Sequence, residues 1–121
     1  MNKKVLIVED HDSLRYIIGA FLSKNFEVVG ARNGLEAMGW LSKGVMPDVI
    51  VSDARMPELD GASFLSNIRC SGLFSKIPVV IISGADSNDE EQEFQKLGIS
   101  AYIRKPFNPI HLQDRLIQIV G

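Results

Sequence analysis

The chain has 121 residues but only one cysteine, Cys70, so no internal disulfide bond can form. Its first apolar run, Val5–Val8, is only four residues long, which is too short for a signal peptide or a membrane span. Neither sign of charge dominates, because 13 basic residues face 15 acidic ones and the net charge is -2. These absences argue against a disulfide-rich secreted protein, a membrane protein, or a nucleic-acid binder that relies on its overall field. They favour a cytoplasmic protein.

The composition is that of a soluble globular domain, with 45% hydrophobic and 23% charged residues. No linker, low-complexity segment or internal repeat divides the chain, so the sequence predicts one domain over residues 1–121. Its last residue follows directly on the last predicted helix. We therefore expect either a stand-alone domain or a piece of a longer protein.

Five short runs are rich in β-branched residues and predict strands. Between them, apolar residues recur at helical spacing, and Asp12 or Ser13 is expected to cap the first helix. The stretch 88–97 is less apolar, and it fits a helix that can shift as well as it fits a plain solvated helix. The strand runs are 4–8, 26–31, 49–52, 78–83 and 101–105, and the helical stripes are Leu14, Ile17, Ile18, Phe21 and Leu22; Leu35, Met38 and Leu41; Phe64, Leu65 and Ile68; Phe94 and Leu97; and Leu112, Leu116, Ile119 and Val120.

Strict alternation of strands and helices predicts an α/β fold, a doubly wound (βα)5 sandwich of the flavodoxin-like type. Its five-stranded parallel sheet should have the order 2-1-3-4-5. The most apolar runs, 5–8, 49–52 and 79–82, should be central because only central strands are covered on both faces. The half-polar runs 26–31 and 101–105 should form the edges.

Reactive side chains follow several of these strands. Glu9 and Asp10 come after the first strand, Asp53 after the third, Ser83 ends the fourth, and Lys105 ends the fifth. Each of them alone fits an ordinary turn, cap or loop residue. In a parallel sheet the carboxyl ends of the strands meet at one edge, next to the point where the strand order reverses. We therefore expect these five side chains to form one site.

Three neighbouring carboxylates repel one another, and a bound divalent cation removes that conflict. Oxygen ligands without cysteine or paired histidines suit Mg²⁺ or Mn²⁺ rather than zinc. Mg²⁺ held by few protein ligands favours phosphate oxygens as further ligands, and Lys105 and Ser83 could meet the remaining ones. An aspartate nucleophile would then form an aspartyl phosphate, which makes Asp53 the expected acceptor.

Four motifs carry a resemblance to a known family: "LIVED" (6–10), "VIVSDARMPELDG" (49–61), "PVVIISG" (78–84) and "GISAYIRKPF" (98–107). Over essentially its whole length the chain resembles the receiver (CheY-like) domains of two-component response regulators. The resemblance implies a phosphorylation-dependent signalling switch in a two-component phosphorelay. It implies a phosphoacceptor rather than an enzyme, with intrinsic Mg²⁺-dependent autophosphorylation and autodephosphorylation.

By this resemblance, Asp53 accepts a phosphoryl group from a histidine kinase or a histidine phosphotransfer protein. Glu9, Asp10 and Asp53 hold Mg²⁺ (or Mn²⁺), with the backbone carbonyl of Arg55 as a further ligand. Lys105 contacts the phosphoryl group.

The resemblance also implies a switch and an output surface. Ser83 is the switch hydroxyl, Tyr102 is the aromatic residue that turns inward when Ser83 moves, and the bond from Lys105 to Pro106 is cis. A downstream protein or effector domain would bind the face formed by the fourth helix, fifth strand and fifth helix. A homodimer on phosphorylation is a further implication, and no direct contact with nucleic acid or membrane is expected.

Some positions depart from the commonest receiver pattern. The acidic pair is Glu-Asp rather than Asp-Asp, and serine stands at position 83 where threonine is common. Arg55 is long and cationic, and we expect it to rim the pocket and to influence the phosphate lifetime. His11 and His111 are interpreted as surface residues at a loop and a helix start.

Two other functions share this fold or this chemistry. A flavin-binding, flavodoxin-like module would need a phosphate-cradling loop after the first strand, where this chain has Glu9 and Asp10. A stand-alone phosphatase with an aspartyl nucleophile would need a second acid and a substrate lid, for which 121 residues leave little room. A receiver that has lost its reactive residues is disfavoured, because every reactive position is filled.

Overall fold

A computed structural model describes residues 3–84 and 88–121. Over these residues the chain alternates five strands with five helices. None of the helices in these two ranges is both long enough and apolar enough to cross a membrane. The elements are β1 (Lys3–Val8), α1 (Asp12–Leu22), β2 (Phe26–Ala31), α2 (Gly34–Ser42), β3 (Val49–Asp53), α3 (Gly61–Cys70), β4 (Val79–Ser83), α4 (Asn88–Leu97), β5 (Ala101–Arg104) and α5 (Pro109–Val120).

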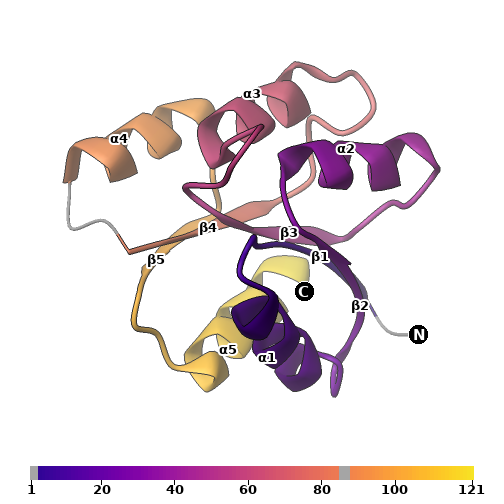
Figure 1. The fold of residues 1–121 in the computed structure, drawn as a ribbon, viewed down its shortest axis with the longest axis vertical. Helices are drawn as coiled ribbons and strands as arrows, with labels where there is room; N and C mark the ends of the chain where they lie inside the picture. Colours follow the sequence, from indigo (N-terminus) through magenta and orange to yellow (C-terminus); the bar gives the residue numbers. More distant parts are fainter. Residues whose placement is uncertain (1–2, 85–87) are drawn as a thin grey trace.

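The five strands form one parallel sheet in the order β2-β1-β3-β4-β5. Helices α1 and α5 cover one face of the sheet, and α2, α3 and α4 cover the other (Figure 1). This is the doubly wound architecture that the sequence predicts, with the expected strand order, central strands and edge strands.

Two apolar cores lie on the two faces of the sheet, and β1 contributes to both. Val5 and Ile7 pack with residues of α1 and α5, whereas Leu6 and Val8 pack with residues of α2, α3 and α4. Every residue of β3 and β4 is buried, while the edge strand β2 is buried only at its two ends. A central strand with both faces covered has little room for a charged side chain before it ends, so charged groups gather at the strand ends.

Three local expectations from the sequence are wrong. Neither Asp12 nor Ser13 caps α1: the N-cap residue is His11, and Asp12 lies in the first turn, where its carboxylate pairs with Arg15. Ile17 and Leu35 belong to the predicted buried stripes, yet each is 55% exposed. Both lie at the margins of their stripes, where helical spacing alone cannot tell the sheet-facing residues from those that face solvent.

Helix α4 is attached to the core through few apolar side chains. Phe94 is its only buried residue, and Leu97 is half-buried. The Phe94 ring lies 6.3 Å, between ring centroids, from that of Tyr102 on β5. The weak apolar stripe seen in the sequence therefore corresponds to weak attachment in the fold.

Helix α3 begins in direct contact with the end of β3. The Gly61 amide donates to the carbonyl of Ala54 at 3.1 Å, and the Asp60 side chain caps the helix by accepting from the Ser63 amide at 2.9 Å. A Cβ atom added to Gly61 would lie 2.6 Å from the carbonyl oxygen of Asp53 and 2.7 Å from that of Ala54. These are backbone atoms that cannot turn aside, so the close approach requires glycine.

We predict that Gly61→Ala lowers the free energy of unfolding by about 1–3 kcal/mol, because the new methyl group must displace the backbone at the end of β3. Gly39→Ala is the matched control, since an added Cβ there meets no atom within 4 Å. Within helix α2 that change should instead raise the free energy of unfolding by about 0.5–1 kcal/mol. Urea denaturation followed by circular dichroism measures both, and equal effects of the two substitutions would contradict the steric argument.

Candidate functional site

Backbone pairing brings the reactive residues to one edge of the sheet. Val8 of β1 pairs with Ser52 of β3, so Glu9 and Asp53 follow neighbouring, aligned positions. The ladder continues past the strands, since the Glu9 amide donates to Ala31 at 3.0 Å and the Lys105 amide donates to Ser83 at 2.8 Å. The sheet itself therefore positions these residues.

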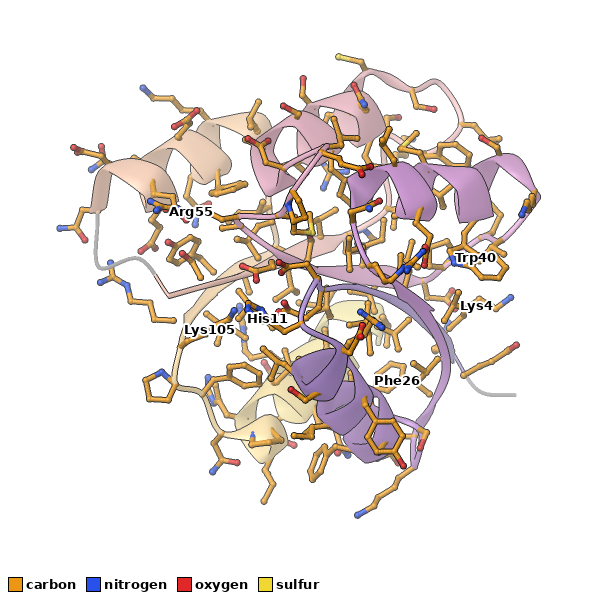
Figure 2. The ribbon with its side chains drawn as sticks, viewed as in Figure 1. Lys4, His11, Phe26, Trp40, Arg55 and Lys105 are labelled. Atoms are coloured by element: carbon orange, nitrogen blue, oxygen red, sulfur yellow. The ribbon has the colours of Figure 1, made fainter. Side chains whose placement is uncertain are left out.

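Figure 2 shows Arg55, His11 and Lys105 toward one end of the sheet, and Lys4, Phe26 and Trp40 toward the opposite end. Lys4 and Phe26 lie at the beginnings of β1 and β2, so Arg55, His11 and Lys105 mark the carboxyl ends of the strands. The predicted metal-binding and phosphoryl-binding residues follow or terminate strands at this edge, whereas Tyr102 lies within β5.

Lys105 connects the two buried carboxylates of the site. Its Nζ atom lies 3.0 Å from Oδ2 of Asp53 and 3.5 Å from Oε1 of Glu9. Glu9 is 2% exposed and Asp53 is 7% exposed, so this ammonium balances charge that water can hardly reach. We define the acidic cluster as Glu9, Asp10 and Asp53; its positive partner, Lys105, follows β5.

The protonation equilibria reflect this crowding. Burial raises the pKa of Glu9, and the negative charge of Asp53 raises it further. The backbone amide of His11 opposes the shift by donating a hydrogen bond to the Glu9 carboxylate. Burial alone would lower the pKa of Lys105, but its hydrogen bonds and charge interactions with Asp53 and Glu9 outweigh that effect and raise it. Lys105 therefore stays charged at neutral pH.

The acidic cluster fits a hard divalent cation. One ligand atom each from Glu9, Asp10, Asp53 and His11 lies within 4.8 Å of the others. Oδ1 of Asp10 is buried and has no hydrogen-bond partner among the residues that the structure describes. A buried carboxylate oxygen without a donor is costly unless a cation completes its shell. Three carboxylates of this kind are the donor set that Mg²⁺ and Mn²⁺ prefer.

The switch residues of the sequence analysis meet on one helix residue, Glu90 of α4. The Ser83 hydroxyl donates to Oε1 of Glu90 at 2.7 Å, and the Tyr102 hydroxyl donates to the same oxygen at 3.2 Å. Nη2 of Arg55 donates to Oε2 at 3.1 Å. Sequence reasoning missed Glu90, because it is one of several acidic residues in the polar stretch 88–97 and no motif distinguishes it.

A family model described as the response regulator receiver domain matches residues 5–117. The chain belongs to this family. The resemblance inferred from the four sequence motifs is thereby confirmed, and the chain is the receiver domain of a CheY-like response regulator in two-component signalling.

Relatives and solved structures agree with this assignment. Chemotaxis protein CheY1 of Helicobacter pylori is 32% identical over 120 residues, which cover 98% of this chain and 97% of that protein. Hybrid signal transduction histidine kinase D of Dictyostelium discoideum is 29% identical over 116 residues, which cover 96% of this chain and 7% of the kinase. The structure of the chemotaxis response regulator CheY4 of Vibrio cholerae superposes with a TM-score of 0.89, at 30% identity and with 98% and 99% of the two chains covered.

Other expectations for the receiver domain can be compared with its geometry. The bond between Lys105 and Pro106 is cis, as the resemblance implies. The backbone amide of Arg55 donates to Oδ1 of Asp53 at 3.3 Å, while its side chain is 77% exposed and extends to α4. His111 is exposed near the start of α5.

His11 is exposed, as expected, but it also contacts the acidic cluster of the receiver domain. Its Nδ1 atom lies 3.2 Å from Oε2 of Glu9 and 3.5 Å from Oδ1 of Asp10. The sequence placed His11 directly after the acidic pair, which was a signal of proximity that its interpretation as a surface residue left unused.

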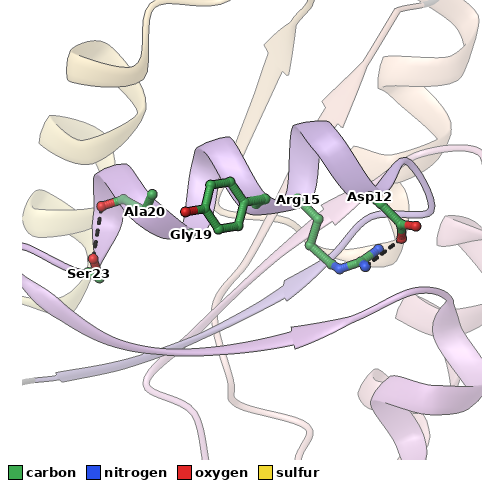
Figure 3. Close-up of a pocket in the computed structure, with 6 residues that line it drawn as sticks. Asp12, Arg15, Gly19, Ala20 and Ser23 are labelled. Carbon is green, nitrogen blue, oxygen red and sulfur yellow. Dashed lines mark hydrogen bonds and ion pairs between the residues drawn. The ribbon is translucent and has the colours of Figure 1, made fainter.

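A separate hollow of about 530 Å³ lies along α1 of the receiver domain (Figure 3). Its lining comes from successive turns of this one helix and the residue after it, and the Asp12–Arg15 ion pair, 2.6 Å long, crosses one end. It contains neither Asp53 nor Lys105. The hollow is therefore separate from the acidic cluster at the strand ends.

We predict that Lys105→Met lowers the free energy of unfolding at neutral pH by about 1–3 kcal/mol, because Glu9 and Asp53 lose the cation that pairs with them. The raised pKa of Lys105 means that its contribution is present through neutral pH and disappears as the pH rises through that pKa. On the acid side, the difference between the two proteins should shrink as the pH falls through the raised pKa of Glu9, since protonated Glu9 no longer repels Asp53.

Urea denaturation of metal-free protein across this pH range measures the effect of Lys105→Met. Lys96→Met, at an exposed position of α4, is the control and should change the free energy of unfolding by less than about 0.5 kcal/mol. A Lys105→Met protein as stable as the wild type at neutral pH would show that Lys105 does not balance the cluster.

Proposed function

We propose that Asp53 accepts a phosphoryl group from a phosphohistidine on a histidine kinase or histidine phosphotransfer protein, and that the chain thereby works as a phosphorylation-dependent switch. The observation that carries this proposal is the buried Asp53 carboxylate at the end of a central strand, 3.0 Å from Lys105 and beside two further acids. An oxygen of Asp53 forms the new bond to phosphorus as the P–N bond breaks. The bonding electron pair passes to the nitrogen, which leaves as neutral imidazole when its second nitrogen is protonated.

Charge on the transferring group needs fixed partners, because catalysis of phosphoryl transfer is mostly positioning and electrostatic stabilisation. Lys105 would donate to a phosphoryl oxygen from its position beside Asp53, and Ser83 would donate to another. A divalent cation, Mg²⁺ or Mn²⁺, held by Glu9, Asp10, Asp53 and the backbone carbonyl of Arg55, would neutralise charge on the phosphoryl oxygens.

Output would follow from movement of the switch residues. In the proposal, Ser83 turns toward the phosphoryl group, Tyr102 fills the space, and the face formed by α4, β5 and α5 changes for a downstream partner or a second copy. Moving a two-state equilibrium from 1:99 to 99:1 requires about 5.5 kcal/mol of differential interaction. A hydrogen bond to a charged group supplies only about 1.5–3 kcal/mol, so we expect partial activation until a partner binds.

The decisive test is incubation with a small phosphodonor, acetyl phosphate, and Mg²⁺, followed by intact-mass measurement. Wild-type protein should gain one phosphoryl group, and Asp53→Asn should gain none. Asp12→Asn is the matched control, since Asp12 is an exposed acid of the same region, and it should be modified like the wild type. A chelator should prevent the reaction.

Other outcomes of this experiment would identify the alternative functions. Equal modification of wild type and Asp53→Asn would rule out Asp53 as the acceptor. Continuous turnover of a phosphomonoester would indicate a phosphatase, and a bound chromophore with a flavin spectrum would indicate a flavodoxin-like module.

Arg55 should affect how long the phosphate persists, because its side chain lies at the rim between Asp53 and α4. We predict that Arg55→Ala shortens the lifetime of the aspartyl phosphate about two- to fivefold, equivalent to a barrier change of less than about 1 kcal/mol, by opening the rim to water. Loss of phosphate after removal of the phosphodonor can be followed by intact mass. Arg32→Ala, which removes an exposed arginine of another loop, serves as control. An unchanged lifetime in Arg55→Ala would refute this role.

A further inference from the structure

Glu90 holds together the three side chains through which phosphorylation would be sensed. We define the Glu90 bridge as the hydrogen bonds from Ser83, Tyr102 and Arg55 to the Glu90 carboxylate. The residues come from β4, β5, the loop after β3, and α4, so the bridge connects the sheet to the helix. The Glu90 side chain is only 13% exposed, and Ser83 is 1% exposed.

We propose that Glu90 is a positioning residue that holds Ser83 and Tyr102 in the unphosphorylated arrangement, and that phosphorylation of Asp53 must break the Glu90 bridge. This inference rests on the proposed function of Asp53. It adds a residue and a competition to that function: the carboxylate of Glu90 and the phosphoryl group require the same donors.

The competition follows from the chemistry of a hydroxyl group. Ser83 has a single proton to donate, and in this structure it donates that proton to Glu90 at 2.7 Å. It can donate to a phosphoryl oxygen only after leaving Glu90. The bond to a carboxylate in a buried position is charge-assisted and stronger than a neutral one. The unphosphorylated state is therefore favoured by a contact that the phosphorylated state must give up.

The same competition between Glu90 and the phosphoryl group applies to Arg55. Its guanidinium pairs with Oε2 of Glu90 at 3.1 Å, while its backbone amide already donates to Asp53. Phosphorylation would replace the single negative charge of the Asp53 carboxylate with about two on the phosphoryl oxygens, close to the base of the Arg55 side chain. An arginine binds phosphate oxygens at least as well as a carboxylate, so the second arm of the bridge weakens at the same time as the first.

Breaking the Glu90 bridge would loosen the first turn of α4. This helix has Phe94 as its only buried residue, one turn further along. Without the bridge, the contacts that join this end of α4 to the sheet include those of Arg104 on β5. Its Nη2 atom lies 3.0 Å from Oδ1 of Asn88 and 3.4 Å from Oε1 of Glu91, and its side chain is more exposed than that of Glu90. A change of charge at Asp53 would thus become a movement of α4, at the face proposed for output.

The pKa of Tyr102 reports on the Glu90 bridge in the unphosphorylated protein. Burial raises the pKa of Tyr102, and the charge of Glu90 and its hydrogen bond raise it further, whereas Ser83 and Arg104 act in the opposite direction. In metal-free protein with Tyr16→Phe, Tyr102 is the one remaining tyrosine, and its ionisation is measured by the absorbance of tyrosinate. Glu90→Gln should lower the pKa of Tyr102, and Glu93→Gln, an exposed acid on the same helix, should leave it unchanged.

The switch itself is tested with beryllofluoride, an analogue of the phosphoryl group, in the presence of Mg²⁺. Glu90→Ala should increase the apparent affinity for beryllofluoride about three- to tenfold over wild type, because the charge-assisted bond from Ser83 to Glu90 no longer competes with it. Glu93→Ala should bind like the wild type. Isothermal titration calorimetry measures the affinities, and circular dichroism checks that each variant is folded.

The outcomes separate this inference from the proposed function. Equal or weaker beryllofluoride binding by Glu90→Ala, with normal binding by the wild type, would overturn the role of Glu90 alone. An unchanged Tyr102 pKa in Glu90→Gln would also overturn it, because the hydrogen bond at the centre of the bridge would be absent. Failure of the wild type to bind beryllofluoride or to become phosphorylated would overturn the proposed function, and the role of Glu90 with it.

Discussion

The pairing of β1 with β3 forces like charges together, and the rest of the site responds to that constraint. Because Val8 aligns with Ser52, the sheet brings Glu9 and Asp53 to one edge whatever their charges. Both are almost fully buried, so water does little to screen their repulsion. Lys105, which follows β5, reduces this repulsion: its Nζ atom lies 3.0 Å from Asp53 and 3.5 Å from Glu9. A site with this imbalance favours binding of a cation and responds strongly to any added negative charge.

Much of the fold could be predicted because its signals are local and repeated. The uninterrupted apolar runs of β3 and β4 require two covered faces, and strict alternation with helices leaves few topologies. The errors occurred where tertiary packing decides. Ile17 and Leu35 fit helical stripes, yet each lies beyond the width that the sheet covers. Asp12 has the chemistry of a cap but lies one position inside the helix, where it pairs with Arg15.

The acidic cluster and Lys105 could be located from the sequence because strand ends are easy to identify and parallel strands share an edge. Glu90 could not be found in this way. Its importance depends on which side of α4 faces the sheet, and an acidic helix with one large buried residue gives little indication of that. The same limit applies to Arg55: its place after Asp53 was evident, but the direction of its side chain toward α4 depends on a helix that begins 33 residues later in the chain.

The two halves of the site also differ in how they can respond to a change of charge. Glu9, Asp53 and Lys105 are fixed by the backbone ladder of buried strands, so they cannot move far without breaking the sheet. Ser83 and Tyr102 are likewise carried by β4 and β5, but they are joined through Glu90 to a helix that buries only Phe94. Local opening occurs first in elements with few buried contacts. If phosphorylation of Asp53 works as proposed, a charge added at the fixed half would be relieved by movement at the weakly packed half, because Glu90 connects Ser83 and Tyr102 to α4 and not to a helix with a full apolar stripe.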